Sequence, residues 1–72
     1  MNPPTDACFP QGTVYMTRGK SPRRCTVIDI WRTYDLAGRL VRVRYVAGHE
    51  FMGQTVIDHD VTETTIKMGL VR

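Results

Sequence analysis

The sequence predicts a mostly β protein, a small barrel of four to five antiparallel strands with one short α or 3-10 turn near the C-terminus. The clearest observation is the run Val41–Tyr45, in which apolar residues alternate with arginines. Alternation at period two is typical of a half-buried strand. Several other short runs are rich in β-branched and aromatic residues and end at glycine or proline, which indicates strands joined by turns. Barrel closure is expected because it removes the exposed strand edges of so small a sheet.

A chain of 72 residues has room for one domain, and it buries only about 60% of its unfolded surface on folding. With 42% hydrophobic and 24% charged residues, the composition argues against disorder along the whole length. Residues 1–11 hold three of the four prolines, Pro3, Pro4 and Pro10. Because proline lacks an amide donor, this stretch is expected to be a flexible lead-in. A single small β-barrel domain is therefore expected at residues 12–72.

The first half of this domain is predicted to contain three strands. Thr13–Thr17 is rich in β-formers and is followed by the basic loop Arg18–Arg23, which holds Gly, Ser and Pro. The next strand is Arg24–Tyr34, and Asp35–Gly38 then has the composition of a turn. The third strand is Arg39–Ala47, so the second and third strands are expected to form a long hairpin.

The second half is expected to be more irregular. Gly48–Gly53 interrupts the alternation and is interpreted as a loop, and Gln54–Asp58 is the fourth predicted strand. Asp60–Glu63 has the form of a capping box, and Gly69 stands where a helix would end. The intervening β-branched residues limit this helix to one or two turns. Leu70-Val71 is the candidate fifth strand.

This layout resembles the SH3-like small barrels, including the KOW and Tudor-like modules. The resemblance is carried by the hairpin Thr26–Ala47, the stretch Val41–Val46 and the late turn Asp60–Ile66 before a final strand. It covers about 60 residues at the level of the fold and implies a binding module. The plasmid-borne type B dihydrofolate reductases, which are tetramers of such barrels, are similar in size and layout. Their active-site strand motif has no match here, so no catalytic residues are carried over.

Positive charge is concentrated in one part of the chain. Eight of the ten basic residues lie between positions 18 and 44, where the only acids are Asp29 and Asp35, so this window carries +6, whereas residues 45–72 carry −2. Arg32, Arg42 and Arg44 are expected to share a surface with the 18–24 loop. Guanidinium groups bind phosphate or carboxylate in bidentate fashion, although a solvated sheet face is also consistent with this pattern. The expected nucleic-acid or partner-binding residues are Arg18, Lys20, Arg23, Arg24, Arg32, Arg42 and Arg44, with Trp31 and Tyr34 as aromatic contacts.

The position of Trp31 is open from sequence. Strict alternation places Trp31 on the face of Val27 and Asp29, with Ile28 and Ile30 on the other. Both faces are partly apolar, and packing of Trp31 in the core is the favoured interpretation. If Ile28 and Ile30 fill the barrel instead, Trp31 lies outside and can stack on a base or contact a partner.

Other chemistry is not expected. Cys8, Cys25, His49 and His59 lack the close spacing of structural zinc sites, so no metal and no cofactor are predicted. His49-Glu50 and Asp58-His59-Asp60 are the only acid–base candidates, and loop and capping roles are expected for them, so no catalytic residue is assigned.

Three further expectations follow from short features of the chain. The apolar pair Phe51-Met52 is expected to plug one barrel end, with a contact loop as the alternative. Two cysteines favour reduced thiols in a cytoplasmic protein over a Cys8–Cys25 bridge. No apolar run approaches the ~18 residues that span a bilayer, so no membrane partner is predicted.

Three functional hypotheses follow from the charge layout and from the resemblances. The first is a non-catalytic small-barrel module that contacts nucleic acid, DNA or RNA, through the basic hairpin. The second is an accessory or inhibitor protein of a mobile element or phage that docks on an acidic surface of a host protein complex. The third, which the reductase resemblance implies, is an enzyme assembled across subunits, so a homo-oligomer is possible.

Overall fold

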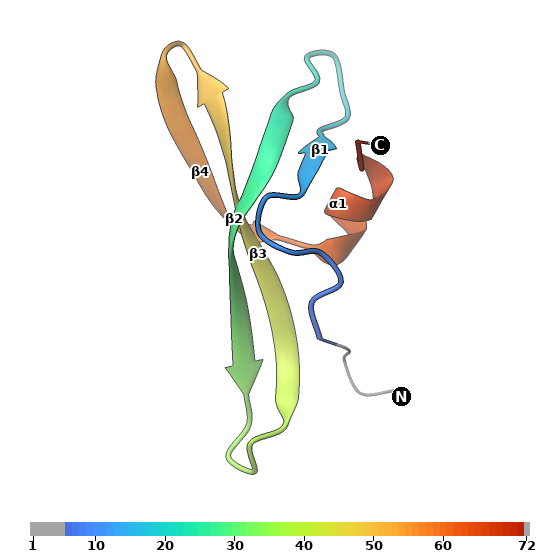
Figure 1. Cartoon of the computed structure of the whole chain (residues 1–72), viewed down its shortest axis with the longest axis vertical. Helices are drawn as coiled ribbons and strands as arrows, with labels where there is room; N and C mark the ends of the chain where they lie inside the picture. The colour runs from blue at the N-terminus through green and yellow to red at the C-terminus, as the bar shows by residue number, and fades with distance from the viewer. Residues whose placement is uncertain (1–5, 72) are drawn as a thin grey trace.

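The computed structural model describes residues 6–71, which form one antiparallel sheet and a short helix. The strands follow one another in the sheet in chain order and are named β1 to β4 (Figure 1). The prediction of a mostly β protein with one short C-terminal helix is confirmed, and within the described residues the sheet is open. The elements are β1 (Val14–Met16), β2 (Arg24–Tyr34), β3 (Leu40–Phe51), β4 (Gln54–Val61) and α1 (Glu63–Met68).

The long β2–β3 hairpin organises the molecule. Its upper half is flanked by β1 on one side and β4 on the other, whereas its lower half extends beyond them as a two-stranded ribbon (Figure 1). The predicted turn at its tip is confirmed. Asp35 Oδ1 accepts hydrogen bonds from the amides of Ala37 and Arg39, both at 2.9 Å, and Gly38 adopts φ 80°. The aspartate thus satisfies the backbone locally, as expected for a turn.

The region from Gly48 to Gly53 is a second hairpin rather than the predicted loop. β3 continues through Gly48, which pairs with Ile57 of β4, and ends at Phe51. The turn consists of Met52 and Gly53, at φ 52° and 78°, the positive values that a tight two-residue hairpin requires. Pairing with β4 therefore outweighs the low strand propensity of glycine.

The helix begins two residues later than the capping box predicted. Asp60 belongs to β4, and Thr62 is the N-cap, whose Oγ1 accepts a hydrogen bond from Thr65 N at 3.3 Å. The predicted end is confirmed, because the Gly69 amide donates to Ile66 O at 3.2 Å. The chain then forms an isolated antiparallel bridge between Leu70 and Tyr15 of β1. The C-terminal segment thus lies against the edge of β1 that β2 leaves free.

The core is small and lies on one face of the sheet. Its best buried large side chains are Tyr45 and Ile66, each 0% exposed. Phe9 packs on Tyr45 with ring centroids 6.3 Å apart, and the Cys8 amide donates to Tyr45 Oη at 3.0 Å. Residues 6–11 of the predicted lead-in therefore pack against the sheet, while residues 1–5 lie outside the described part of the chain. The buried cluster consists of Tyr15, Cys25, Val27, Tyr45, Ala47, Val61 and Ile66.

Ile66→Ala is expected to lower the free energy of unfolding by about 2–5 kcal/mol, because it leaves a cavity under the sheet. Met68→Ala in the same helix is the matched control, since Met68 is 53% exposed, and its effect should stay within about 0.5 kcal/mol. Urea unfolding followed by circular dichroism measures both. Equal losses for the two variants would contradict the packing of α1 described here.

Candidate nucleic-acid interface

A β-bulge at Ile28 decides which side chains of β2 point away from the core. Val27 pairs with Ala47 and Asp29 pairs with Val46, so Ile28 is the extra residue. A bulge shifts the alternation of the side chains that follow it. Val27 and Ile30 consequently both face the core, while Trp31 faces away from it and is 50% exposed. The favoured interpretation of Trp31 as a core residue is therefore wrong.

We call the sheet face opposite the core cluster the outer face, and Trp31 forms its aromatic centre. The Trp31 indole Nε1 donates to Asp29 Oδ2 at 3.0 Å. The Trp31 ring also stands against the imidazole of His59 in β4, with centroids 5.5 Å apart. These contacts hold the indole in place while half of its surface stays open to a ligand.

The arginines of the hairpin do not all share one surface. Arg42 and Arg44 pair with Thr33 and Trp31 and lie on the outer face, whereas Arg32 pairs with Val43 and lies on the core face. The expectation that Arg32 joins Arg42 and Arg44 is therefore wrong, and the reason is again the shifted alternation.

Three of the hairpin arginines form ion pairs within the chain. Arg32 Nε lies 2.6 Å from Asp6 Oδ1, and Arg39 Nε lies 3.3 Å from Asp35 Oδ2. Arg44 pairs with Asp60. Their charges are thus partly neutralised by neighbouring carboxylates, which weakens their attraction for an external anion.

Arg18, Lys20, Arg23 and Arg24 gather at the other end of the sheet, and we call this group the basic end. Within residues 6–71, no carboxylate lies in ion-pair distance of these four cations. The loop that carries them is closed at its base, because Thr17 N donates to Arg23 O at 2.9 Å and Arg23 N donates to Thr17 Oγ1 at 2.8 Å. These two hydrogen bonds therefore hold the backbone at the base of the basic loop.

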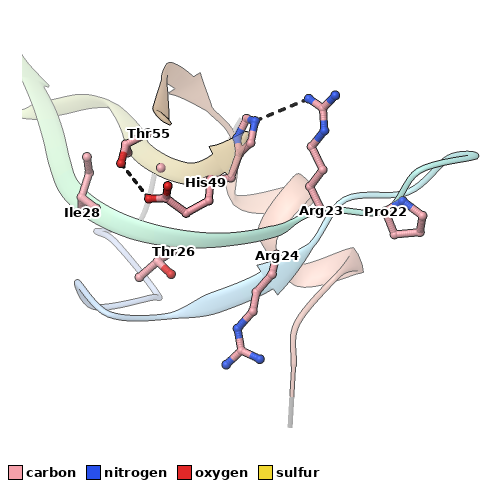
Figure 2. A pocket seen from close by; sticks show the side chains of 9 residues that line it. Pro22, Arg23, Arg24, Thr26, Ile28, His49 and Thr55 are labelled. Carbon is pink, nitrogen blue, oxygen red and sulfur yellow. Dashed lines mark hydrogen bonds between the residues drawn. The ribbon is translucent and has the colours of Figure 1, made fainter. Parts of the chain in front are cut away.

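Arg23 and Arg24 point in opposite directions from the start of β2 (Figure 2). Arg23 Nη1 lies 3.4 Å from His49 Nε2, and its guanidinium stands 5.0 Å from the centroid of the Phe51 ring. Phe51 and Met52 are 48% and 88% exposed. The expectation that they plug a barrel end is therefore wrong, because the extended β3–β4 hairpin carries them away from the core.

A groove of about 610 Å³ lies between the start of β2 and the β3–β4 hairpin (Figure 2). We call it the outer groove. Glu50, which also lines it, accepts a hydrogen bond from Thr55 Oγ1 at 2.7 Å. The groove thus offers cations at one side and an apolar floor at Ile28. Its other lining residues include Arg23, Arg24, Thr26, His49 and Thr55.

The remaining candidate residues lie apart from the basic end. Tyr34 is 56% exposed beside the turn at the far tip of the ribbon. Cys25 is buried in the core, whereas Cys8 lies at the surface. Residues 6–71 contain no cluster of three or more His, Cys, Asp or Glu side chains arranged to hold a metal ion. None of the helices in this part of the chain is long and apolar enough to span a bilayer.

Comparisons with protein-family models, with curated proteins and with solved structures found no match to this chain.

The sequence alone did not predict that His49 and Phe51 lie beside the basic end. Its pattern predicts a loop for both residues, whereas β3 pairing brings them beside Arg23. The signal that could have placed them is the Met52-Gly53 turn between two apolar runs, which is compatible with a tight hairpin.

The Asp6–Arg32 pair is expected to titrate at low pH. The hydrogen bond from Arg32 holds the pKa of Asp6 below its usual value of 3.8. Since the folded-state pKa is lowered, the contribution of the pair is complete above pH 3.8 and is lost as the pH falls through the folded-state value. The Arg32 Hε resonance should follow this titration by NMR and become pH-independent in Asp6→Asn. A midpoint at or above 3.8 would contradict the pair.

Proposed function

We propose that this chain is a non-catalytic module of the small SH3-like barrel type that binds nucleic acid with its basic end and outer face. The observation that carries the proposal is that Arg23 and Arg24 line the outer groove, and that neither these two nor Arg18 and Lys20 of the adjoining loop form an ion pair with a carboxylate of residues 6–71. Cations that are not ion-paired with a carboxylate can neutralise phosphates, which supplies most of the non-specific affinity for nucleic acid.

An aromatic ring beside Arg23 and a second one further along β2 support nucleic acid over a small anion. Trp31 lies on the same face as Ile28 and is half exposed, and Phe51 is half exposed beneath the Arg23 guanidinium. Aromatic faces stack on bases whatever the sequence, and stacking beside a basic groove is the usual arrangement of single-strand binders. We therefore favour a single-stranded ligand that runs from the basic end towards Trp31 and Arg42.

The barrel expectation remains part of this proposal. The meander of four strands and the bridge between Leu70 and Tyr15 give the strand neighbours that an SH3-like barrel requires. Closure of the sheet between β4 and the C-terminal segment is proposed on this basis, since it would protect two free edges.

Docking on a protein partner is the second candidate. It is favoured by the apolar side chains at both hairpin tips, since Leu36 is fully exposed and Met52 is 88% exposed. Protruding apolar side chains are typical anchors of protein interfaces. A pull-down that recovers one protein at stoichiometric yield, insensitive to nuclease and abolished by Leu36→Ser, would favour this role over nucleic-acid binding.

Binding to a short single-stranded oligonucleotide is expected to weaken with salt, with a log–log slope of about −3 if four phosphates are neutralised. Lys20→Gln and Arg24→Gln should each make the slope shallower by about 0.7. Arg39→Gln is the control, because Arg39 pairs with Asp35 at the far tip, and it should leave the slope unchanged. Fluorescence anisotropy across a salt series measures this, and an absence of binding at low salt would end the proposal.

Trp31→Ala is expected to weaken the same binding by about 1–3 kcal/mol, the usual contribution of one stacked base. Trp31→Phe keeps an aromatic face and should recover much of the loss. Tryptophan fluorescence of the native chain should also be quenched on addition of the oligonucleotide. Equal affinities for Trp31→Ala and the native chain would show that the ligand does not cross the outer face.

A further inference from the structure

Among the described residues that line the outer groove, Glu50 is the acidic one. Its Oε1 accepts a hydrogen bond at 2.7 Å from the hydroxyl of Thr55, the residue that pairs with it across β3 and β4. Within residues 6–71 no cation lies in ion-pair distance of Glu50, although Arg23 and Arg24 line the same groove. Because each carboxylate oxygen can accept two hydrogen bonds, the Thr55 hydroxyl orients the group and leaves acceptor capacity on both oxygens.

A depression with a glycine floor lies next to this carboxylate. Gly48 is two residues before Glu50 on the same face of β3, about 7 Å away along the strand. A Cβ atom placed on Gly48 would lie 3.4 Å from Ile57 Cδ1 and from Thr55 Cγ2, and 3.9 Å from Ile28 Cγ2. Ile28 and Ile57 are 45% and 39% exposed. The missing side chain thus leaves an apolar seat on which the flat face of a base can rest.

The carboxylate beside this seat matches the edge of one base. Side chains stand roughly perpendicular to a sheet, so Glu50 meets the edge of a ring that lies flat over Gly48. The Watson–Crick edge of guanine carries two neighbouring donors, N1–H and N2–H, one for each carboxylate oxygen. Cytosine and adenine have one amino donor beside a ring-nitrogen acceptor, and the N3–H of thymine or uracil lies between two carbonyl oxygens. Guanine alone therefore satisfies both oxygens without an opposing acceptor.

We propose that the outer groove holds a guanine base over Gly48, with the Watson–Crick edge of the base on the Glu50 carboxylate. This inference rests on the proposed function and adds a base preference to it. Ile28 and Ile57 contact the face of the base, and Arg24 contacts the adjoining phosphate. The groove is open to solvent, so the selection comes from the hydrogen-bonding pattern of the base edge and not from enclosure.

The negative charge of Glu50 gives this inference a distinctive signature. A carboxylate repels phosphates, so it lowers the affinity for any strand whose base does not bind it. Glu50→Gln removes this repulsion, and the glutamine side-chain oxygen can still accept the bond from the Thr55 hydroxyl. An amide, however, offers one acceptor and one donor in place of two acceptors. The variant is therefore expected to bind a strand without guanine more tightly than the native chain does, while it loses the preference for guanine.

The experiment compares short thymidine strands whose central base is guanine, adenine, cytosine, hypoxanthine or thymine, by fluorescence anisotropy at fixed low salt and pH 7.5. We expect the guanine strand to bind about fivefold tighter than the thymine strand, the lower end of what a bidentate side-chain contact to a base contributes. The lower end applies because water competes in an open groove. Hypoxanthine keeps N1–H but lacks the 2-amino group, so it should lose most of this advantage.

Two variants and a control locate the effect. Glu50→Gln should remove the guanine advantage and strengthen binding of the thymine strand. Gly48→Ala should also reduce the advantage, because the methyl group fills the seat, and the backbone accepts alanine since the φ of Gly48 lies outside the left-handed region. Glu63→Gln removes the same charge from the start of α1, outside the groove, and should leave the advantage unchanged. Circular dichroism verifies that each variant is folded.

The outcomes separate this inference from the proposed function. Equal affinity for all the strands would overturn the base preference and leave the proposed function standing, whereas an absence of binding to every strand would overturn both. A preference for another base, or a guanine preference that survives in Glu50→Gln, would also overturn the inference. The comparison of guanine with hypoxanthine uses the native chain, so this part of the test does not depend on the folding of a variant.

Discussion

One irregularity in strand pairing, the bulge at Ile28, determines which face of the sheet each later side chain of β2 occupies. Without it, Trp31 would lie on the face of Val27 and compete for the space that Tyr45 and Ile66 fill. With it, Val27 and Ile30 both face the core, and Trp31 joins Arg42 and Arg44 on the outside. A shift of one residue exchanges the faces of a whole strand segment, so the exposure of Trp31 and the place of Arg32 on the core face depend on this single insertion.

The charge distribution divides into two parts with different roles. Along the ribbon, Arg32, Arg39 and Arg44 each pair with a carboxylate from another part of the chain or from the turn, and their charges serve local structure. At the basic end, Arg18 contacts the Met68 carbonyl and Arg23 contacts His49 and Phe51. The net charge of +3 therefore says less about function than the positions of the cations that form no ion pair within residues 6–71.

Much of the fold follows from the sequence, but the faces of the strands do not. The limits of β2, the Asp35–Gly38 turn and the role of Gly69 were predictable, because alternation, turn residues and helix ends are local properties. The bulge at Ile28 and the continuation of β3 through Gly48 depend on the partner strands, which local patterns do not specify. The candidate site was predictable in part. The 18–24 cations were identified, whereas the separation of Arg32 and the contribution of His49 and Phe51 required the pairing register.

The central claim is that the outer face and the basic end together contact nucleic acid. NMR chemical-shift mapping on addition of a short single-stranded oligonucleotide tests it most directly. The account predicts that the perturbed signals include the amides of residues 18–21, 23, 24 and 55 and the Trp31 indole Hε1, with residues 63–68 of α1 unaffected. Perturbations confined to α1 or to the ribbon tip at residues 35–38, with the indole signal unchanged, would contradict it.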